Sequence, residues 1–326
     1  MAMEKIRWGV LGTADIARWQ TIPGMREADS CVLYAIAGRS IEKARQFQSE
    51  FGFEKACGSY DELLSDPQVQ AVYVPLPNDL HLEWVKRALK QKKHVLCEKP
   101  LALNAAQAED MFRTAEENGV HLMEAFAYLH NPFVHAAKAE IDAGAVGSVR
   151  YVESAFLGGP PRENNYRARR DAGGGAQYDL GCYPLSMALW LMEKAPVQVR
   201  ASALFNENGI DLATSALLSF EGGAVANLYC GMLLPASRLD RFHIVGDRGE
   251  IFSSFYFNQP GEIAYTLLRN GKAEEKRVTA KQNYRLEVEQ LGRCILNGES
   301  PAVSPAFSLL VARTQDRILD EIGFWK

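Results

Sequence analysis

The chain has 326 residues, of which 47% are hydrophobic, and 36 Lys and Arg against 40 Asp and Glu give a formal net charge of −4. This composition excludes a disordered or fibrous protein, and the length predicts two domains, each with its own core. Because the net charge is negative and the basic residues are scattered, we expect no nucleic-acid partner.

Neither the cysteines nor the hydropathy indicates a secreted or membrane protein. The six cysteines form no CxxC pair, and a chain of this size does not need disulfides. No stretch reaches the roughly 18 apolar residues of a membrane span, and the short apolar N-terminal stretch leads directly into an expected strand rather than a cleavage site. We therefore expect reduced thiols, no metal site, no membrane partner and a cytoplasmic protein.

The N-terminal part alternates short β-rich runs with amphipathic stretches, the pattern of a parallel sheet with crossover helices. The expected strands are 6–11, 32–37, 56–57, 71–75, 94–97 and 121–125. The expected helices are 15–27, 41–51, 60–64, 81–91 and 105–118. These elements predict an α/β doubly wound, dinucleotide-binding Rossmann domain over residues 1–126.

After residue 147 the pattern changes to long strand-like runs with hairpin turns. The expected strands are 149–156, 197–205, 213–220 and 224–233, and the expected helices are 176–192, 284–296 and 305–322. This predicts an α+β domain with a mostly antiparallel open sheet over residues 127–326, for substrate binding and oligomerisation, whose last helix can pack back on the first domain. Helices covering one sheet face leave the other for a partner, so we expect a homodimer or homotetramer.

A nucleotide site is predicted where the first strand meets the first helix, because free backbone N–H groups at a helix N-terminus bind a pyrophosphate. The residues of this turn are Gly12, Thr13, Ala14, Asp15 and Ile16. Ala14 and Ala17 occupy the second and third glycine positions of the dinucleotide fingerprint. Alanine is accepted at the third, and Ala14 requires the phosphate to lie slightly further out. A plain strand-to-helix turn is the alternative.

The end of the second expected strand bears on the choice between NAD and NADP. An acidic residue there would bind the 2′-hydroxyl of the NAD ribose, but the sequence has Arg39 and Ser40 instead. Arg39 can pair with a 2′-phosphate, and Ser40 can donate to it. We predict NADP(H) as the preferred cofactor, with NAD(H) possible, and a solvated Arg39 is the alternative.

Three segments resemble the Gfo/Idh/MocA oxidoreductases, a family that includes glucose-fructose oxidoreductase, inositol and xylose dehydrogenases, and dimeric dihydrodiol dehydrogenase. They are GVLGTADIA at 9–17, CEKPLA at 97–102 and GGGAQYDLGCY at 173–183. The resemblance covers nearly the whole chain. The ADIA turn, the AVYVPLP strand and the LHNP segment look closest to members that reduce keto groups on nucleotide-linked sugars.

Lys99 stands at the C-terminal end of the fifth expected strand, the edge of an open α/β sheet where ligands bind, and Pro100 ends that strand. In the family this position lies against the nicotinamide and its ribose. The resemblance implies cofactor contacts from Pro75, Leu76, Asn78, His81, Glu98 and Lys99. For Lys99 taken alone, a solvent-facing charge is the alternative.

Asp179 and Tyr183 are four residues apart on an expected helix, so they share one face, and three glycines precede them. Tyr183 is the predicted acid or base. A free phenol has a pKa near 10, and the ammonium of Lys99 would lower this pKa and donate to the substrate oxygen. Asp179 would orient a substrate hydroxyl or Lys99. The predicted catalytic residues are therefore Lys99, Asp179 and Tyr183.

Further substrate contacts are expected from Tyr128, His130 and Arg167. Arg167 matches an arginine that often precedes the glycine run in the family, and Leu129 stands where many relatives have an arginine. The basic cluster around Arg167 can meet a phosphate or sugar hydroxyls, or can be a solvated loop. Its other members are Arg162, Arg169 and Arg170.

These patterns together predict an NADP(H)-dependent oxidoreductase. It would transfer hydride between nicotinamide and a secondary alcohol or ketone of a sugar or sugar-like ring. Oxidation of an aldose or of a trans-dihydrodiol is an alternative within the same class. A non-catalytic NADP-sensing regulator on the same fold is the alternative from another class, and the presence of both Lys99 and Tyr183 favours the enzyme.

Overall fold

The structure, a computed structural model, describes residues 5–233, 239–254 and 257–326. The chain forms two compact units. The first contains the residues up to His130 together with Lys281–Ser308, and the second contains Asn131–Ala280 and Leu309–Lys326. The sequence predicts a division at residue 126 with everything after it in the second domain, so residues 127–130 and 281–308 are the parts assigned differently.

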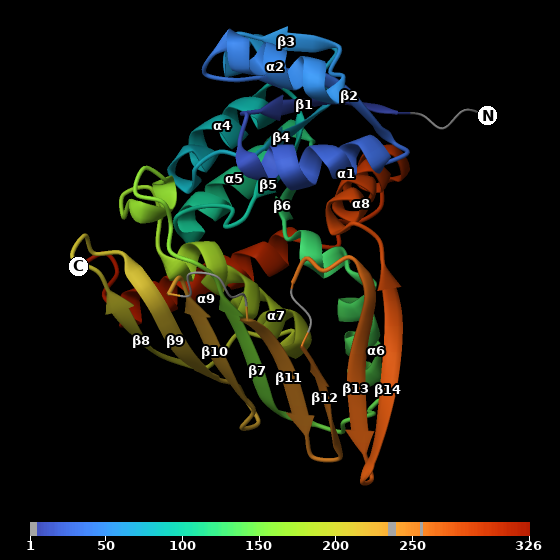
Figure 1. Cartoon of the computed structure of the whole chain (residues 1–326), viewed down its shortest axis with the longest axis vertical. Helices are drawn as coiled ribbons and strands as arrows, with labels where there is room; N and C mark the ends of the chain where they lie inside the picture. The colour runs from blue at the N-terminus through green and yellow to red at the C-terminus, as the bar shows by residue number, and fades with distance from the viewer. Residues whose placement is uncertain (1–4, 234–238, 255–256) are drawn as a thin grey trace. The chain divides into compact units, whose positions relative to one another are not determined.

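The first unit is built on a six-stranded parallel sheet in the order β3-β2-β1-β4-β5-β6 (Figure 1). The strands are β1 Ile6–Leu11, β2 Cys31–Ala37, β3 Lys55–Cys57, β4 Ala71–Val74, β5 His94–Glu98 and β6 Leu122–Ala125. The predicted doubly wound Rossmann fold is confirmed. The strand order reverses between β1 and β4, and ligands of such sheets bind at this point, at the carboxyl ends of the strands.

The helices of this unit are η1 Ala17–Thr21, α1 Ile22–Glu27, α2 Ile41–Phe51, α3 Tyr60–Ser65, α4 Asn78–Lys90, α5 Ala105–Asn118, η2 Ala127–His130 and α8 Asn283–Asn297. Four of them, α2, α3, α5 and α8, begin at a residue whose side chain accepts a hydrogen bond from the first turn. Ser40 caps α2 by accepting from the Lys43 N–H, and Gly52 ends this helix in the left-handed conformation. The late helix α8 packs on α1 and β5.

The second unit is an eight-stranded sheet in the order β14-β13-β12-β11-β7-β10-β9-β8 (Figure 1). Only the β7–β10 pair is parallel among its described strand pairs, so the expected mostly antiparallel sheet is confirmed. The strands are β7 Val149–Leu157, β8 Gln198–Phe205, β9 Asp211–Ser219, β10 Val225–Gly231, β11 Leu239–Gly246, β12 Gly249–Ser253, β13 Gly261–Arg269 and β14 Lys272–Ala280. The helices are α6 Pro132–Asp142, η3 Tyr166–Ala168, η4 Gln177–Gly181, α7 Cys182–Met192 and α9 Pro305–Glu321.

One face of this sheet is covered by helices, with α7 on β7 and β10 and α6 on β14. On the opposite face the strand register aligns one row of side chains across six strands. The row runs through Phe252, His243, Glu153, Asn227, Leu217 and Arg200. Leu217 and Phe252 in this row are exposed, as is Tyr229 nearby on the same face. We call this surface the open face.

Three further observations concern the part of the chain that the structure describes. All six cysteines are buried there, and none of them forms a disulfide. No described helix is long and apolar enough to cross a membrane. The described histidines, cysteines and carboxylates contain no group of three or more that could hold a metal ion.

Candidate active site

The turn after β1 has the geometry of a phosphate-binding loop. Gly12 follows the strand directly with φ +130°, and its N–H donates to the Ala37 carbonyl at 2.9 Å. A Cβ at Gly12 would lie 3.2 Å from Leu76 Cδ2, so a side chain there would crowd the loop after β4. The next helical turn begins at Asp15, and the first N–H groups of a helix have no partner within it. These residues fit a dinucleotide pyrophosphate.

The end of β2 presents a cation and a helix N-terminus. Arg39 is exposed directly after the strand, beside Ser40. The Ser40 hydroxyl is already used within the chain, since it donates to Glu42 at 2.6 Å and accepts from the Lys43 N–H at 3.4 Å. Arg39 is therefore the more available of the two for a 2′-phosphate.

The loops after β4 and β5 are joined through a buried histidine. His81 is fully buried in α4, with Nε2 2.8 Å from the Leu76 carbonyl oxygen and Nδ1 3.0 Å from the Pro100 carbonyl oxygen. Burial lowers the pKa of His81, and the two carbonyl contacts oppose this shift. Both ring nitrogens are thus engaged with the main chain, and His81 links the loop that contains Leu76 to the turn that contains Lys99.

Lys99 follows β5 directly and is partly exposed, while its neighbours are anchored in the interior. Glu98 accepts a hydrogen bond of 2.5 Å from the Tyr73 hydroxyl, which accepts in turn from Thr21 at 2.9 Å. On the other side, Glu124 of β6 accepts the Leu101 N–H at 2.9 Å. Burial raises the pKa of Glu124 to about 7, and the charge of Lys99 opposes this rise. The turn that carries Lys99 is therefore held by two buried carboxyl groups.

A third carboxyl group, Glu287 of α8, is fully buried in the same unit, and neither of its oxygens has a hydrogen-bond partner among the described residues. Burial, and next the charge of Glu98, raise the pKa of Glu287 well above its usual value. The folded state therefore holds a proton that the unfolded state releases, so this group's contribution to stability is present at acid pH and lost as the pH rises.

We expect Glu287→Gln to melt at a higher temperature than the wild type at pH 8, by on the order of 5 °C, with a smaller difference at pH 5. Thermal unfolding at both values measures this. Glu289→Gln on the same helix loses an ion pair with Arg285 and serves as the control, whose difference from wild type should not widen with pH. A lower melting temperature of Glu287→Gln at pH 8 would contradict the assignment.

In the second unit the glycine run, Gly173 to Gly175, makes room for another segment of the same chain. A Cβ at Gly174 would lie 2.4 Å from the Arg167 carbonyl oxygen, and the Gly175 N–H donates to that oxygen at 2.9 Å. The Arg167 side chain returns to the helix, where its Nε lies 2.8 Å from Asp179 Oδ2. The predicted close approach of the glycine backbone thus accommodates the loop 166–170.

The basic cluster is largely paired internally. Arg169 pairs with Asp171 at 2.7 Å, and Arg170 donates to the Phe324 and Lys326 carbonyls. Together with the ion pair between Arg167 and Asp179, these contacts favour a structural loop over a phosphate-binding site.

Tyr183 lies in the first turn of α7 and is 9% exposed. Its ring packs against Phe156, with centroids 5.0 Å apart, and against Phe257 at 5.2 Å. The preceding segment η4, which contains Asp179, is π-helical rather than α-helical as predicted. Such π-turns are rare and are frequent at functional sites.

The predicted substrate contacts Tyr128 and His130 lie in η2 and are buried, with 0% and 8% exposure. Pro75, Leu76 and Asn78 are buried in and just after the loop following β4. Tyr73, Glu124 and Glu287 are not among the predicted site residues, because polar residues within buried strands and helices give no local signal in the sequence.

Comparison with known proteins agrees with this geometry. The family model for oxidoreductases with an NAD-binding Rossmann fold, Gfo/Idh/MocA, matches residues 6–126, and the C-terminal domain model of the same family matches residues 134–252. The chain belongs to the Gfo/Idh/MocA oxidoreductase family. The predicted family, the dinucleotide-binding domain and the interpretation as an enzyme are thereby confirmed.

Individual relatives of this Gfo/Idh/MocA protein cover nearly its full length. NADP-dependent D-xylose 1-dehydrogenase 2 of Haloferax volcanii is 35% identical, over 96% of each chain. Trans-1,2-dihydrobenzene-1,2-diol dehydrogenase of Xenopus tropicalis is 30% identical, over 97% of this chain and 98% of the relative. The crystal structure of a 3-ketoreductase from Actinomadura kijaniata, in complex with NADP and TDP-benzene, superposes with a TM-score of 0.91 at 31% identity, over 98% of each chain.

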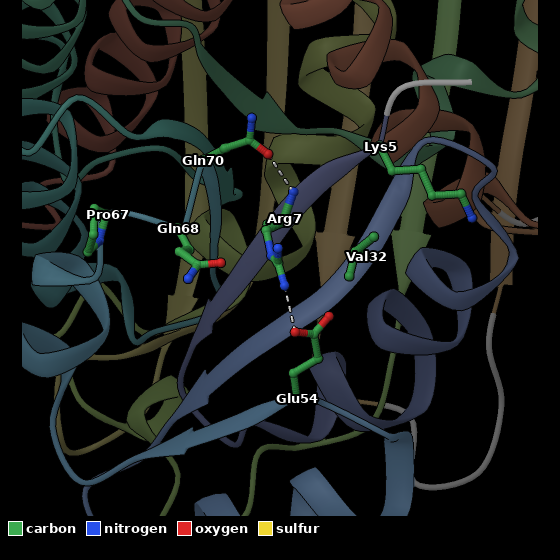
Figure 2. A pocket seen from close by; sticks show the side chains of 7 residues that line it. All are labelled: Lys5, Arg7, Val32, Glu54, Pro67, Gln68 and Gln70. Carbon is green, nitrogen blue, oxygen red and sulfur yellow. Dashed lines mark hydrogen bonds and ion pairs between the residues drawn. The ribbon is translucent and has the colours of Figure 1, made fainter. Parts of the chain in front are cut away.

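Elsewhere on the first unit of this family member there is an open depression with a volume of about 440 Å³, and Figure 2 shows the side chains that line it. It is lined by Lys5, Arg7, Val32, Glu54, Pro67, Gln68 and Gln70. The guanidinium of Arg7 pairs with Glu54 at 2.6 Å, and the main-chain N–H of Arg7 donates to Gln70 Oε1 at 2.9 Å. These residues lie at the amino ends of the strands, opposite the edge where parallel sheets bind ligands, so the depression is not part of the candidate site.

Proposed function

We propose that this protein is an NADP(H)-dependent oxidoreductase that transfers hydride between nicotinamide and a secondary alcohol or ketone of a sugar or sugar-like ring. The observation that carries the proposal is Lys99, placed at the carboxyl edge of a dinucleotide-binding sheet on a turn held by buried Glu98 and Glu124. Reduction of a keto sugar is the preferred direction, since the 3-ketoreductase relative binds NADP and a TDP compound.

In this proposal Lys99 and Tyr183 act on the same carbon–oxygen bond. When bound, the nicotinamide supplies or accepts the hydride. Tyr183 gives the proton to the nascent alkoxide, or takes it from the alcohol in the reverse direction. The ammonium of Lys99 donates to the substrate oxygen while that oxygen carries negative charge, and it favours the phenolate of Tyr183.

Asp179 and Arg167 have a supporting role in this proposal. Because Arg167 Nε lies 2.8 Å from Asp179 Oδ2, the carboxyl group is held in one orientation by a charge-assisted contact. We propose that the pair orients a substrate hydroxyl, with Tyr128 and His130 as further substrate contacts.

For the A. kijaniata 3-ketoreductase, crystal structures include variants with a lysine changed to alanine or glutamate and a tyrosine changed to phenylalanine.

The test is turnover by the purified protein. NADPH consumption is measured against keto sugars, free and nucleotide-linked, and NADP reduction is measured against aldoses and trans-dihydrodiols. Turnover of keto sugars supports the proposal. Activity confined to the oxidative set would establish instead an aldose or dihydrodiol dehydrogenase, the second candidate, which the xylose and dihydrodiol dehydrogenase relatives favour.

Arg39 is proposed to set the preference for NADP. We expect Arg39→Ala to raise the KM for NADPH about 10- to 100-fold, because charge-assisted hydrogen bonds contribute roughly 1.5–3 kcal/mol each. The KM for NADH should change little. Steady-state kinetics with both cofactors measure this, and Arg45→Ala, an exposed arginine on α2, is the matched control. Equal losses with both cofactors would contradict the role of Arg39.

We also propose that the protein forms a homodimer or homotetramer through the open face. Exposed Leu217, Tyr229 and Phe252 lie on this face among polar side chains, and such apolar residues favour association. Leu217→Asp should shift the protein to a smaller species in light scattering coupled to size exclusion. Val197→Asp changes another exposed residue, outside the strands, and should not. An unchanged mass for Leu217→Asp would contradict this interface.

A further inference from the structure

A buried carboxyl group stands at the start of the helix that carries Asp179 and Tyr183. Asp211, the first residue of β9, is 0% exposed. Its Oδ2 accepts the Gln177 N–H at 2.7 Å and the Thr214 hydroxyl at 2.8 Å. Burial raises the pKa of Asp211 to about 6, and these hydrogen bonds oppose the rise. Because burial of a carboxyl group costs free energy, we expect a carboxyl group at this position to have a structural or functional role.

The glycine run provides the space for this carboxyl group. Gly175 has φ +98°, and a Cβ at this position would lie 1.9 Å from Asp211 Oδ1. Any side chain at residue 175 would therefore displace the carboxyl group or the start of the helix. Gly175, which the sequence predicts to lie close to a ligand, is required here by Asp211.

Asp211 and the glycine run together determine where the helix begins. Gln177, whose N–H is bound by Asp211, is the first residue of η4, two residues before Asp179 and six before Tyr183. The Asp179 N–H donates to the Gly175 carbonyl at 3.2 Å, so the same turn continues from Gly175 into η4. A shift of Gln177 would move both side chains, and small displacements of reacting groups cost large factors in rate.

We propose that Asp211 is a positioning residue for the reaction: its carboxyl group holds the first turn of the η4–α7 helix and thereby sets the placement of Asp179 and Tyr183. This inference rests on the proposed function, in which those two residues bind and protonate the substrate. Asp211 acts through the Gln177 N–H, so the ability of residue 211 to accept that hydrogen bond is the property that matters.

The test compares substitutions that keep or remove the acceptor. Asp211→Asn retains an oxygen for Gln177 and Thr214 and should keep kcat within about 3-fold of wild type. Asp211→Ala leaves the Gln177 N–H without this acceptor and should lower kcat about 10- to 100-fold, with the dissociation constant for NADPH unchanged. Gly175→Ala should lower kcat similarly, although the carboxyl group is still present.

Stability and turnover are separated by a second measurement and a control. Val303→Ala removes part of a fully buried side chain in the first unit, and should lower the melting temperature without lowering kcat at 25 °C. Hydrogen exchange of the amides of residues 176–183 should accelerate in Asp211→Ala and not in Asp211→Asn. Thr214→Val, which loses one of the two hydrogen bonds to the carboxyl group, should fall between wild type and Asp211→Ala in both readouts.

The outcomes are distinct. A folded Asp211→Ala with wild-type kcat and wild-type exchange over 176–183 would overturn the inference, as would an Asp211→Asn that loses as much activity as Asp211→Ala. If the wild type turns over no sugar or dihydrodiol, the proposed function fails, and the exchange comparison still decides whether Asp211 holds this turn. If Asp211→Ala and Gly175→Ala do not fold, Thr214→Val and Asp211→Asn decide it. A lower kcat and faster exchange over 176–183 in Thr214→Val than in Asp211→Asn would support the inference, and wild-type values in Thr214→Val would overturn it.

Discussion

Replacing Lys99 by alanine is expected to lower kcat by about 10³-fold while NADPH still binds. The ammonium is proposed to stabilise negative charge on the substrate oxygen and to favour the phenolate of Tyr183, and loss of one such donor costs about 10²–10³ in rate. Loss of the effect on the Tyr183 phenolate adds to the loss of this donor. The measurement is kcat from steady-state turnover of the best sugar substrate, together with NADPH affinity from fluorescence titration.

The control for this experiment is Lys90→Ala, which removes an exposed lysine from the last turn of α4 and should leave both values unchanged. In the oxidative direction, where the phenolate takes the proton, a partial recovery of Lys99→Ala at higher pH would support the role of the ammonium in lowering the phenol pKa, since the phenol then ionises without help. Wild-type kcat in Lys99→Ala would remove Lys99 from the mechanism, whatever the substrate.

Tyr183→Phe is expected to lower kcat by about 10²–10⁴-fold, the usual contribution of a positioned general acid or base. The ring contacts with Phe156 and Phe257 do not involve the hydroxyl, so the variant should fold and bind NADPH normally. Rapid mixing of the NADPH complex with substrate measures the hydride-transfer step directly.

Tyr178→Phe gives a matched comparison, because Tyr178 is a fully buried tyrosine of the same helix that packs on Phe324. Its loss of a hydroxyl should reduce stability more than kcat. If Tyr178→Phe and Tyr183→Phe reduce kcat equally, Tyr183 is not the acid or base, and the effect belongs to the integrity of the helix.

The secondary structure of the first unit was predictable because local rules apply along it. Buried β-rich runs, such as the one that forms β4, indicate strands of a parallel sheet. Ser40 and Gly52 mark the two ends of α2 through capping chemistry. The second unit was harder to predict. The strands β11, β12, β13 and β14 are not among the ranges expected from the sequence. The last of them, β14, is rich in Lys and Glu and lacks the clear alternation that would mark it as a strand.

For the candidate site, too, the sequence identified some residues, whereas only the structure showed the contacts of others. Lys99, Asp179 and Tyr183 stand in recognisable motifs, so the sequence identified them as candidates. His81 was expected to contact the cofactor, yet the structure engages both of its ring nitrogens with main-chain carbonyls. Arg167 was assigned to substrate, and the structure pairs it with Asp179. In both cases the partner lies on a segment distant in sequence or across a tight turn, and no spacing rule connects the two.

The sequence by itself determined the family, the Rossmann domain and the acid–base candidates, because strand periodicity, helix caps and short motifs are encoded over a few neighbouring residues. Only the tertiary structure decided how those candidates are held. Glu124, Glu287 and Asp211 lie far in sequence from Leu101, Glu98 and Gln177, the residues that they affect or that affect them, and burial, which depends on the whole fold, raises the pKa of each. Desolvation of a carboxyl group is a property of its surroundings in three dimensions, and therefore no local pattern reveals it.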